Sequence, residues 1–174
     1  MPETYLIPSQ GYFEMLALLL AARGVDFLST WIATPTLVLE GNPIAKKMGW
    51  KLSGILNLII CFVFAQWPLA AIFFATASAL VAAHNFRSAW LMRSMGEQEY
   101  RYWFTDRLFR TSLAFYFACL FGETLLTSAV GAAIVWFSPN NSAPFAIGVG
   151  VMGYAILVLF YTMLYAVRIR RGGR

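Results

Sequence analysis

Charged residues are scarce in this chain of 174 residues. Asp, Glu, Lys and Arg together make up 12% of it, whereas 60% of the residues are hydrophobic. A soluble domain carries about 25% charged residues, so this composition excludes an ordinary water-soluble domain. Thirteen Lys and Arg against eight Asp and Glu leave a net charge of +5. These basic residues cluster between long apolar runs, which indicates membrane topology, and we expect no nucleic-acid partner.

The residue types that build redox, haem and metal centres are also rare. The two cysteines, Cys61 and Cys119, lie in separate apolar runs, which favours packing over a disulfide. His84 is the single histidine, and this excludes a multi-histidine haem or metal site. The motifs H-E-x-x-H, G-x-S-x-G and G-x-x-x-x-G-K-[ST] are absent as well. We therefore expect no cofactor; the sequence leaves a metal undecided and disfavours an enzyme without excluding one.

Five apolar stretches are long enough to cross a bilayer, which takes about 20 residues. The block 52–92 is twice that length, and Gln66-Trp67-Pro68 divides it because a helix usually ends before proline. We therefore predict an all-α, polytopic transmembrane helix bundle that forms a single domain over residues 1–174. The predicted spans are 12–39, 52–66, 68–92, 111–137 and 145–167.

The basic residues predict the orientation of this bundle. Apart from Arg23 and Arg87, they lie in three segments, 46–51, 93–110 and 168–174, and with five spans all three fall on one side of the membrane. Cytoplasmic segments carry the excess of Lys and Arg, so we predict an outside N-terminus and a cytoplasmic C-terminus. Segment 93–110 mixes arginine with Tyr102 and Trp103, which predicts an amphipathic helix at the cytoplasmic surface.

Ionisable side chains also lie inside the predicted spans. Arg23 and Asp26 are one turn apart in the first span, and Thr30 continues the same helical face. Glu123 lies in the fourth span. Counting about 1.5 Å per residue from the predicted cytoplasmic ends places Asp26 and Glu123 at one level, about 20 Å deep. Charged groups at such a depth usually face a bundle interior, a partner or a water-filled cavity.

We therefore predict a polar column inside the bundle that binds an ion, a proton or a substrate. Its predicted members are Arg23, Asp26, Thr30, Glu40, Asn42, His84, Asn85 and Glu123. Glu40 and Asn42 would form its cytoplasmic mouth. A structural interpretation stays open, because Arg23 and Asp26 can neutralise each other and polar side chains also hold membrane helices together.

Two short motifs add a resemblance. Asp26 begins a D-x-x-x-T pattern, and Glu40 begins an E-x-N-P pattern. Together they resemble the signature of an uncharacterised family of small bacterial integral membrane proteins. The likeness covers about residues 20–92 and ends with His84-Asn85. It implies a compact helical membrane fold in a bacterial inner membrane and marks the motif residues as site positions, and it implies no substrate.

Deep carboxylates favour a transport function. An Asp or Glu in a dry site can take up and release a proton, or bind a cation beside threonine hydroxyls. We therefore favour proton- or cation-linked transport or conduction. An odd number of spans cannot form two equal halves, so we expect a homo-oligomer or a larger membrane complex.

Two alternatives remain. The chain can be a non-catalytic accessory or assembly subunit whose polar groups hold a larger complex together. It can also be a membrane enzyme that acts on a lipid or prenyl substrate at the cytoplasmic face. Such an enzyme needs acidic metal ligands near the headgroups, where Glu40 and Asn42 are expected but Asp26 and Glu123 are not.

Overall fold

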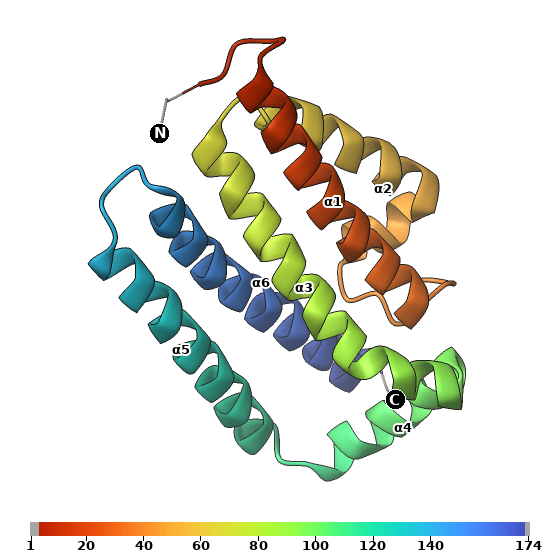
Figure 1. The fold of residues 1–174 in the computed structure, drawn as a ribbon. Coiled ribbons are helices and arrows are strands. Elements are labelled where there is room, and N and C mark those ends of the chain that lie inside the picture. Colours follow the sequence, from red (N-terminus) through yellow and green to blue (C-terminus); the bar gives the residue numbers. More distant parts are fainter. Residues whose placement is uncertain (1–3, 173–174) are drawn as a thin grey trace.

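The computed structural model describes residues 4–172, and within this range all regular secondary structure is helical (Figure 1). The helices are α1 (Gln10–Ala33), α2 (Pro43–Phe64), α3 (Pro68–Met95), α4 (Glu97–Arg110), α5 (Leu113–Phe137) and α6 (Ala143–Gly172). All of these except α4 are long and apolar enough to cross a membrane, which makes five candidate spans. The prediction of an all-helical chain with five candidate membrane spans is thereby confirmed.

Capping residues and prolines place the helix starts. The Ser9 side chain accepts a hydrogen bond from the backbone N–H of Tyr12 at 3.2 Å and so caps α1. Asn42 caps α2 in the same way, directly before Pro43. Pro68 begins α3. Proline suits the first helical position because the N–H that it lacks would have no helical partner there.

The first predicted span is too long. Helix α1 ends at Ala33, and Thr34 has a non-helical backbone with φ −145° and ψ 75°. Thr34 precedes Pro35, and the ring of a proline disfavours the helical conformation in the residue before it. The predicted end of the first span at Leu39 is therefore wrong. Residues 34–42 form an irregular loop instead.

The second predicted span begins too late. Helix α2 starts at Pro43 and contains a kink at Gly49, whose φ is +69°. Glycine adopts such a positive φ readily because it has no Cβ. The kink separates a short helical piece, 43–48, from the longer part that corresponds to the predicted span 52–66.

The spans lie side by side in the order α5, α6, α3, α1, α2 (Figure 1). Contacts between backbones bring α5 and α6 together: a Cβ placed on Gly131 would come within 2.7 Å of the carbonyl oxygen of Gly148, and the reverse distance is also 2.7 Å. On the other side of α6, Gly150 lies against Thr76 and Phe73 of α3. Small residues permit such close approach between membrane helices.

An apolar cluster joins α1, α2 and α3 at the end of the molecule where the described chain begins. Its buried members are Tyr12, Leu16, Leu19, Cys61, Ala65, Ala71 and Ala75. The backbone N–H of Tyr5 donates to the carbonyl oxygen of Gln66 at 2.7 Å, which ties the N-terminal segment to this end. Cys61 therefore has a packing role.

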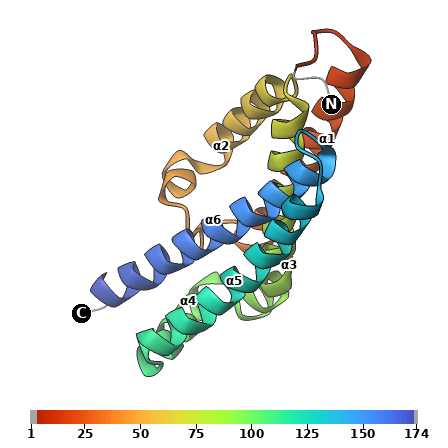
Figure 2. The same cartoon turned by 90° about the vertical axis from the view of Figure 1, so that its left-hand side faces the viewer.

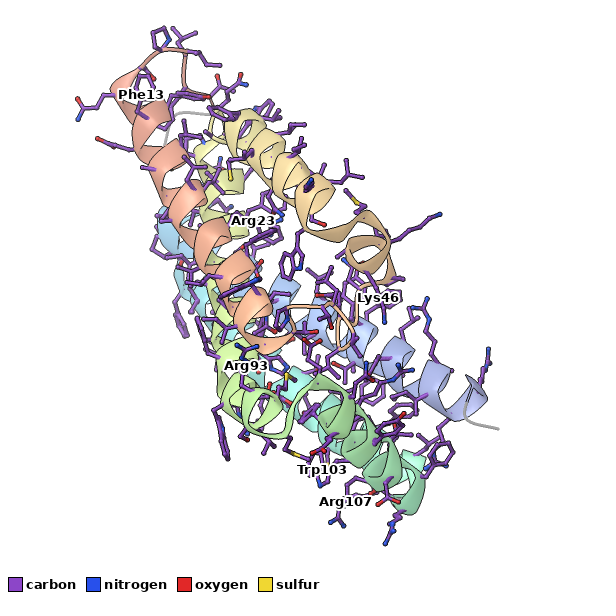
Figure 3. The ribbon with its side chains drawn as sticks, turned by 90° about the vertical axis from the view of Figure 1, so that its right-hand side faces the viewer. Phe13, Arg23, Lys46, Arg93, Trp103 and Arg107 are labelled. Carbon is purple, nitrogen blue, oxygen red and sulfur yellow. The ribbon has the colours of Figure 1, made fainter. Side chains whose placement is uncertain are left out.

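The basic segments gather at the opposite end of the bundle. Figure 3 shows Lys46, Arg93 and Arg107 toward one end and Phe13 at the other. Helix α4 lies at the basic end, with 73% of Tyr102 and 39% of Trp103 exposed. It corresponds to the amphipathic segment predicted over 93–110. This separation of charge along the bundle agrees with the pattern from which the orientation was predicted.

We expect Gly148→Ala to loosen the α5–α6 contact. The new methyl group would meet the Gly131 carbonyl oxygen, and overpacking of this kind costs about 1–3 kcal/mol. Gly24→Ala is the matched control, because no atom lies within 4 Å of a Cβ placed there. Thermal unfolding in detergent, followed by circular dichroism, should show a lower midpoint for Gly148→Ala alone. Equal midpoints for the two variants would contradict the close helix contact.

Candidate functional site

A cavity of about 470 Å³ lies between α1, α2, α3 and α6. Figure 2 shows α2 standing apart from α6, and residues of both helices line the cavity between them. Small-molecule sites in proteins commonly have volumes of about 300–1,000 Å³, so this one is large enough for an ion with its waters or for a small solute.

The structure brings most of the predicted polar column to this cavity. The predicted residues among its lining are Arg23, Asp26, Thr30, Glu40, Asn42, His84 and Asn85. The lining also includes polar residues that were not predicted as site members, namely Trp50, Ser53, Asn57, Tyr161 and Thr162. The last two lie on α6, outside the family resemblance, and their signal in the sequence is two adjacent hydroxyl groups inside an apolar run.

Asp26 shares its arginine with a second acceptor. The Nη1 atom of Arg23 lies 3.4 Å from Oδ2 of Asp26 and 3.1 Å from Oγ of Ser78 on α3. A charge-assisted hydrogen bond between these groups is usually about 2.7–2.9 Å long, so the pair is loose. Of the described side chains, only Arg23 donates to the Asp26 carboxylate. Most of the hydrogen-bonding capacity of this carboxylate is therefore free toward the cavity.

Asn85 joins α3 to α1 beside Asp26. Its Nδ2 atom donates to Oγ of Ser29 at 3.1 Å and to Oγ1 of Thr30 at 3.0 Å. The Ser29 and Thr30 hydroxyls in turn donate to the backbone carbonyl of Asp26. The amide nitrogen of Asn85 is thus committed to helix packing. Within residues 4–172 no side chain donates to its Oδ1 atom, which leaves an acceptor at the cavity.

The mouth of the cavity is built from the loop 34–42. The Glu40 carboxylate accepts a hydrogen bond from the backbone N–H of Asn42 at 2.8 Å, and Asn42 caps α2 through the N–H of Ile44 at 2.9 Å. Burial raises the pKa of Glu40 above its usual value, although the Asn42 N–H and the Lys46 ammonium act in the opposite direction. Glu40 therefore takes up a proton more readily than an exposed glutamate.

Trp50 fixes the other side of this mouth. Its Nε1–H donates to the carbonyl oxygen of Pro35 at 2.8 Å, and its ring packs edge to face on Phe27 with 4.8 Å between ring centroids. The contact ties α2, just after the kink at Gly49, to the loop that follows α1. It therefore helps to set how far α2 stands from the rest of the bundle.

Glu97 holds the loop from the side of α4, and the sequence analysis missed it. Its carboxylate accepts from Thr34 Oγ1 at 2.8 Å, from Thr36 Oγ1 at 2.6 Å and from the Thr36 N–H at 3.1 Å. Burial alone would raise the pKa of Glu97, but these hydrogen bonds outweigh it and the pKa lies below its usual value. No local pattern signals this role, because the partners lie about 60 positions away in the sequence.

The apolar cluster closes the cavity at one end. The residues of α1 that line the cavity begin at Arg23. The cluster residues Tyr12, Leu16 and Leu19 come earlier in the same helix. In α2 the cluster residue Cys61 follows the last lining residue, Asn57. The cavity therefore has its mouth toward the basic end and no continuation through the cluster.

Glu123 does not belong to this site. Its side chain is exposed on α5, it does not line the cavity, and α5 packs on α6 rather than on α1. Counted from the helix ends, the two carboxylates still lie at similar depths: Asp26 is seven residues before the end of α1, about 10 Å, and Glu123 is ten residues after the start of α5, about 15 Å. The depth of about 20 Å predicted for Asp26 is too large because the first span was taken to end at Leu39 instead of Ala33.

No group of three His, Cys, Asp or Glu side chains in the described part of the chain lies close enough to hold a metal ion. Neither a protein-family model, nor a curated protein, nor a solved structure matches this chain. The resemblance to an uncharacterised membrane protein family therefore stays a prediction, and the case for a function rests on the cavity.

We expect Glu97→Ala to release the loop 34–42. The substitution removes three hydrogen bonds to a carboxylate that is partly exposed to solvent, and we expect a loss of about 1–2 kcal/mol in local stability. Hydrogen exchange at the Thr36 amide should accelerate about tenfold. Glu99→Ala makes the same chemical change at an exposed position of α4 and should leave this exchange unaltered.

The same contact has a predictable pH dependence. The pKa of Glu97 is lower in the folded protein than its usual 4.5, so its carboxylate stabilises the fold above that pH. This contribution is lost as the pH falls through the lower folded value. Thr36 should thus stay protected at neutral pH and lose protection only in acid. Unchanged protection in the Glu97→Ala variant would contradict a role for Glu97 in holding the loop.

Proposed function

We propose that this protein binds a cation or a protonated solute in the cavity and couples its movement, or that of a proton, to transport across the membrane. Support comes from the charge of the lining, which includes two carboxylates, Asp26 and Glu40, and one guanidinium, Arg23. The lining therefore carries one more negative charge than positive charge. Such a charge is costly unless a cation or a proton neutralises it.

The free acceptors of the lining suit a cation. The Asp26 carboxylate has one loose donor, and the Oδ1 atom of Asn85 has none among the described side chains. Carboxylate, amide and hydroxyl oxygens are the ligands of hard cations. Glu40, whose pKa is raised by burial, can exchange a proton at the mouth as the charge of the cavity changes. Cation binding and proton release would thus be linked.

Transport also requires the closed end to open. In the proposed cycle α2 moves away from α1 at the apolar cluster, where the hydroxyl of Tyr12 donates to the Phe62 carbonyl oxygen across 3.3 Å. In this movement the backbone bends at its two non-helical points beside α2, the kink at Gly49 and the loop 34–42. The present arrangement corresponds to the state in which the site faces the basic end.

A second candidate is an enzyme that acts on a lipid or prenyl substrate. The observation that favours it is the separation of α2 from α6, where Leu56, Leu157 and Val158 line the cavity beside its polar groups. A chain of hydrocarbon can reach the site between these two helices while a polar headgroup contacts Glu40 and Asn42. If the variants below lose an enzymatic activity on a lipid but keep their ion flux, the result favours this candidate.

We expect Asp26→Asn to abolish proton or cation flux in liposomes that contain the purified protein. Removal of Asp26 leaves Arg23 without its partner, and breaking a fully buried pair costs about 3–5 kcal/mol. The cost should be smaller here, because the two side chains are 24% and 19% exposed. Glu14→Gln is a matched control, since this exposed glutamate lies at the opposite end of α1 and contacts Gln10.

The double variant Arg23→Gln with Asp26→Asn separates chemistry from stability. It removes both charges together, so the protein should fold about as well as the native chain. We expect it to remain inactive, because the cavity has lost its binding carboxylate. Full activity of a well-folded double variant would show that the pair is structural. The protein would then be better explained as an accessory subunit than as a transporter.

We also propose that the basic end faces the cytoplasm of a bacterial inner membrane, with the N-terminus outside. In a chain whose Cys61 and Cys119 are replaced by Ala, a membrane-impermeant maleimide should label Asn140→Cys in intact cells. It should label Lys47→Cys only after the membrane is opened. Both positions are exposed, so access to reagent depends on the side of the membrane. The reverse pattern would overturn the orientation.

A further inference from the structure

Arg87 on α3 and Glu123 on α5 are charged side chains that the cavity does not use. Both are exposed, and neither belongs to the cavity lining. In the part of the chain that the structure describes, the ion pairs join other residues. Two opposite charges are therefore left without an ionic partner on helices that are long and apolar enough to cross a membrane.

These two charges lie on the same side of the molecule. Helices α3 and α5 both pack on α6 and have little contact with each other, and Figure 1 shows them on either side of α6. The phenol of Tyr154 on α6 lies within electrostatic reach of both Arg87 and Glu123. Both charges therefore lie near Tyr154, and no ion pair joins them.

The charges also lie at similar levels along the bundle. Arg87 is eight residues before the end of α3, about 12 Å, and Glu123 is ten residues after the start of α5, about 15 Å. Both helix ends are at the basic end of the molecule. An arginine can extend toward the headgroups from this depth, but the shorter side chain of Glu123 cannot. Contact with lipid alone would therefore leave the carboxylate without a partner.

Exposed residues continue the surface around each charge. We define the α3–α5 face by its exposed residues at helical spacing: Ala83, Arg87, Trp90 and Ser94 on α3, and Cys119, Glu123, Leu126 and Val130 on α5. Gly122 lies beside Glu123, and no atom is within 4 Å of a Cβ placed there. Small residues next to the charges leave room for another helix to approach.

We propose that the α3–α5 face binds a second copy of this chain, in a dimer with twofold symmetry held by two reciprocal Arg87–Glu123 ion pairs. Charge complementarity is the argument for this partner. A rotation about the membrane normal keeps every residue at its depth, so Arg87 of one copy meets Glu123 of the other at nearly the same level. A twofold interface uses the same patch on both copies, and this patch carries one charge of each sign.

A charge-exchange experiment tests the proposal. The variants Arg87→Glu and Glu123→Arg are produced with different affinity tags, separately and together, and purified in lipid nanodiscs. Each variant alone should be monomeric, because like charges then meet at both contacts. Co-expression should restore a mixed dimer, since each contact then joins opposite charges. The protein is purified through one tag, and the amount of the other tag that is recovered with it is measured. We expect at least tenfold more of the second tag when the tags are on the two different variants than when both are on the same variant.

The design separates pairing between copies from pairing within one chain. If Arg87 and Glu123 bind each other inside one chain, both variants carry a repulsive pair and co-expression restores nothing, which overturns the proposal. If the charge-reversed variants are degraded when produced alone, their abundance becomes the measurement, and rescue by co-expression supports the dimer.

Two further measurements complete the test. The native chain should have the mass of a dimer in nanodiscs, and a native monomer, with or without bound lipid, overturns the proposal. Arg87→Gln and Glu123→Gln remove charge without repulsion and should each shift the native dimer toward monomer. Glu14→Arg inverts an exposed charge away from the α3–α5 face and should leave the dimer intact. A dimer unaffected by either neutral variant is held by another surface and contradicts the proposed one.

Discussion

Pro35 prevents α1 from continuing past Thr34, and the cavity depends on this. The chain leaves the helix while still beside the bundle, crosses an irregular loop and enters α2 with a kink at Gly49. The loop exposes backbone groups that need partners, and two helices supply them: Glu97 of α4 bonds the N–H of Thr36, and Trp50 of α2 bonds the carbonyl oxygen of Pro35. Asn42 of the loop in turn caps the first N–H groups of α2. Non-helical backbone near a membrane is tolerated only where protein or water satisfies it.

The position of α2 follows from the way this loop is held. At one end α2 packs into the apolar cluster through Cys61 and Ala65, and at the other end Trp50 holds it to the loop. Helix α6 is fixed elsewhere, by backbone contacts of Gly148 with α5 and of Gly150 with α3. Because α2 and α6 are fixed by different neighbours, the space between them is not closed by direct helix packing, and polar residues can line it.

Every charged group inside an apolar span needs a partner or water. The two sets of charges in this chain meet this need in different ways. Arg23 and Asp26 lie one turn apart and face the cavity, where water or a solute can complete their interactions. Arg87 and Glu123 lie on different helices and face outward, where lipid cannot. We therefore propose a binding site for the inward charges and a partner for the outward charges.

Part of this structure could be predicted from the sequence because the responsible effects are local. Long apolar runs determine that the chain forms membrane helices, since each span must satisfy its own backbone. Spacing along a helix places Arg23, Asp26 and Thr30 on one face, and the pattern of basic residues agrees with their collection at one end of the bundle. The polar members of α1, α3 and the E-x-N-P turn were predictable for the same reason.

The tertiary structure decided what depends on neighbours distant in the sequence. The role of Glu97 comes from partners in another loop, and Tyr161 and Thr162 reach the cavity because close glycine contacts fix α6 beside α3. Glu123 and Asp26 have the same chemistry and similar apolar surroundings in the chain, yet they lie on different sides of the molecule. Depth can be counted along a helix, but the direction in which a side chain faces depends on which helices pack together, and that choice belongs to the fold.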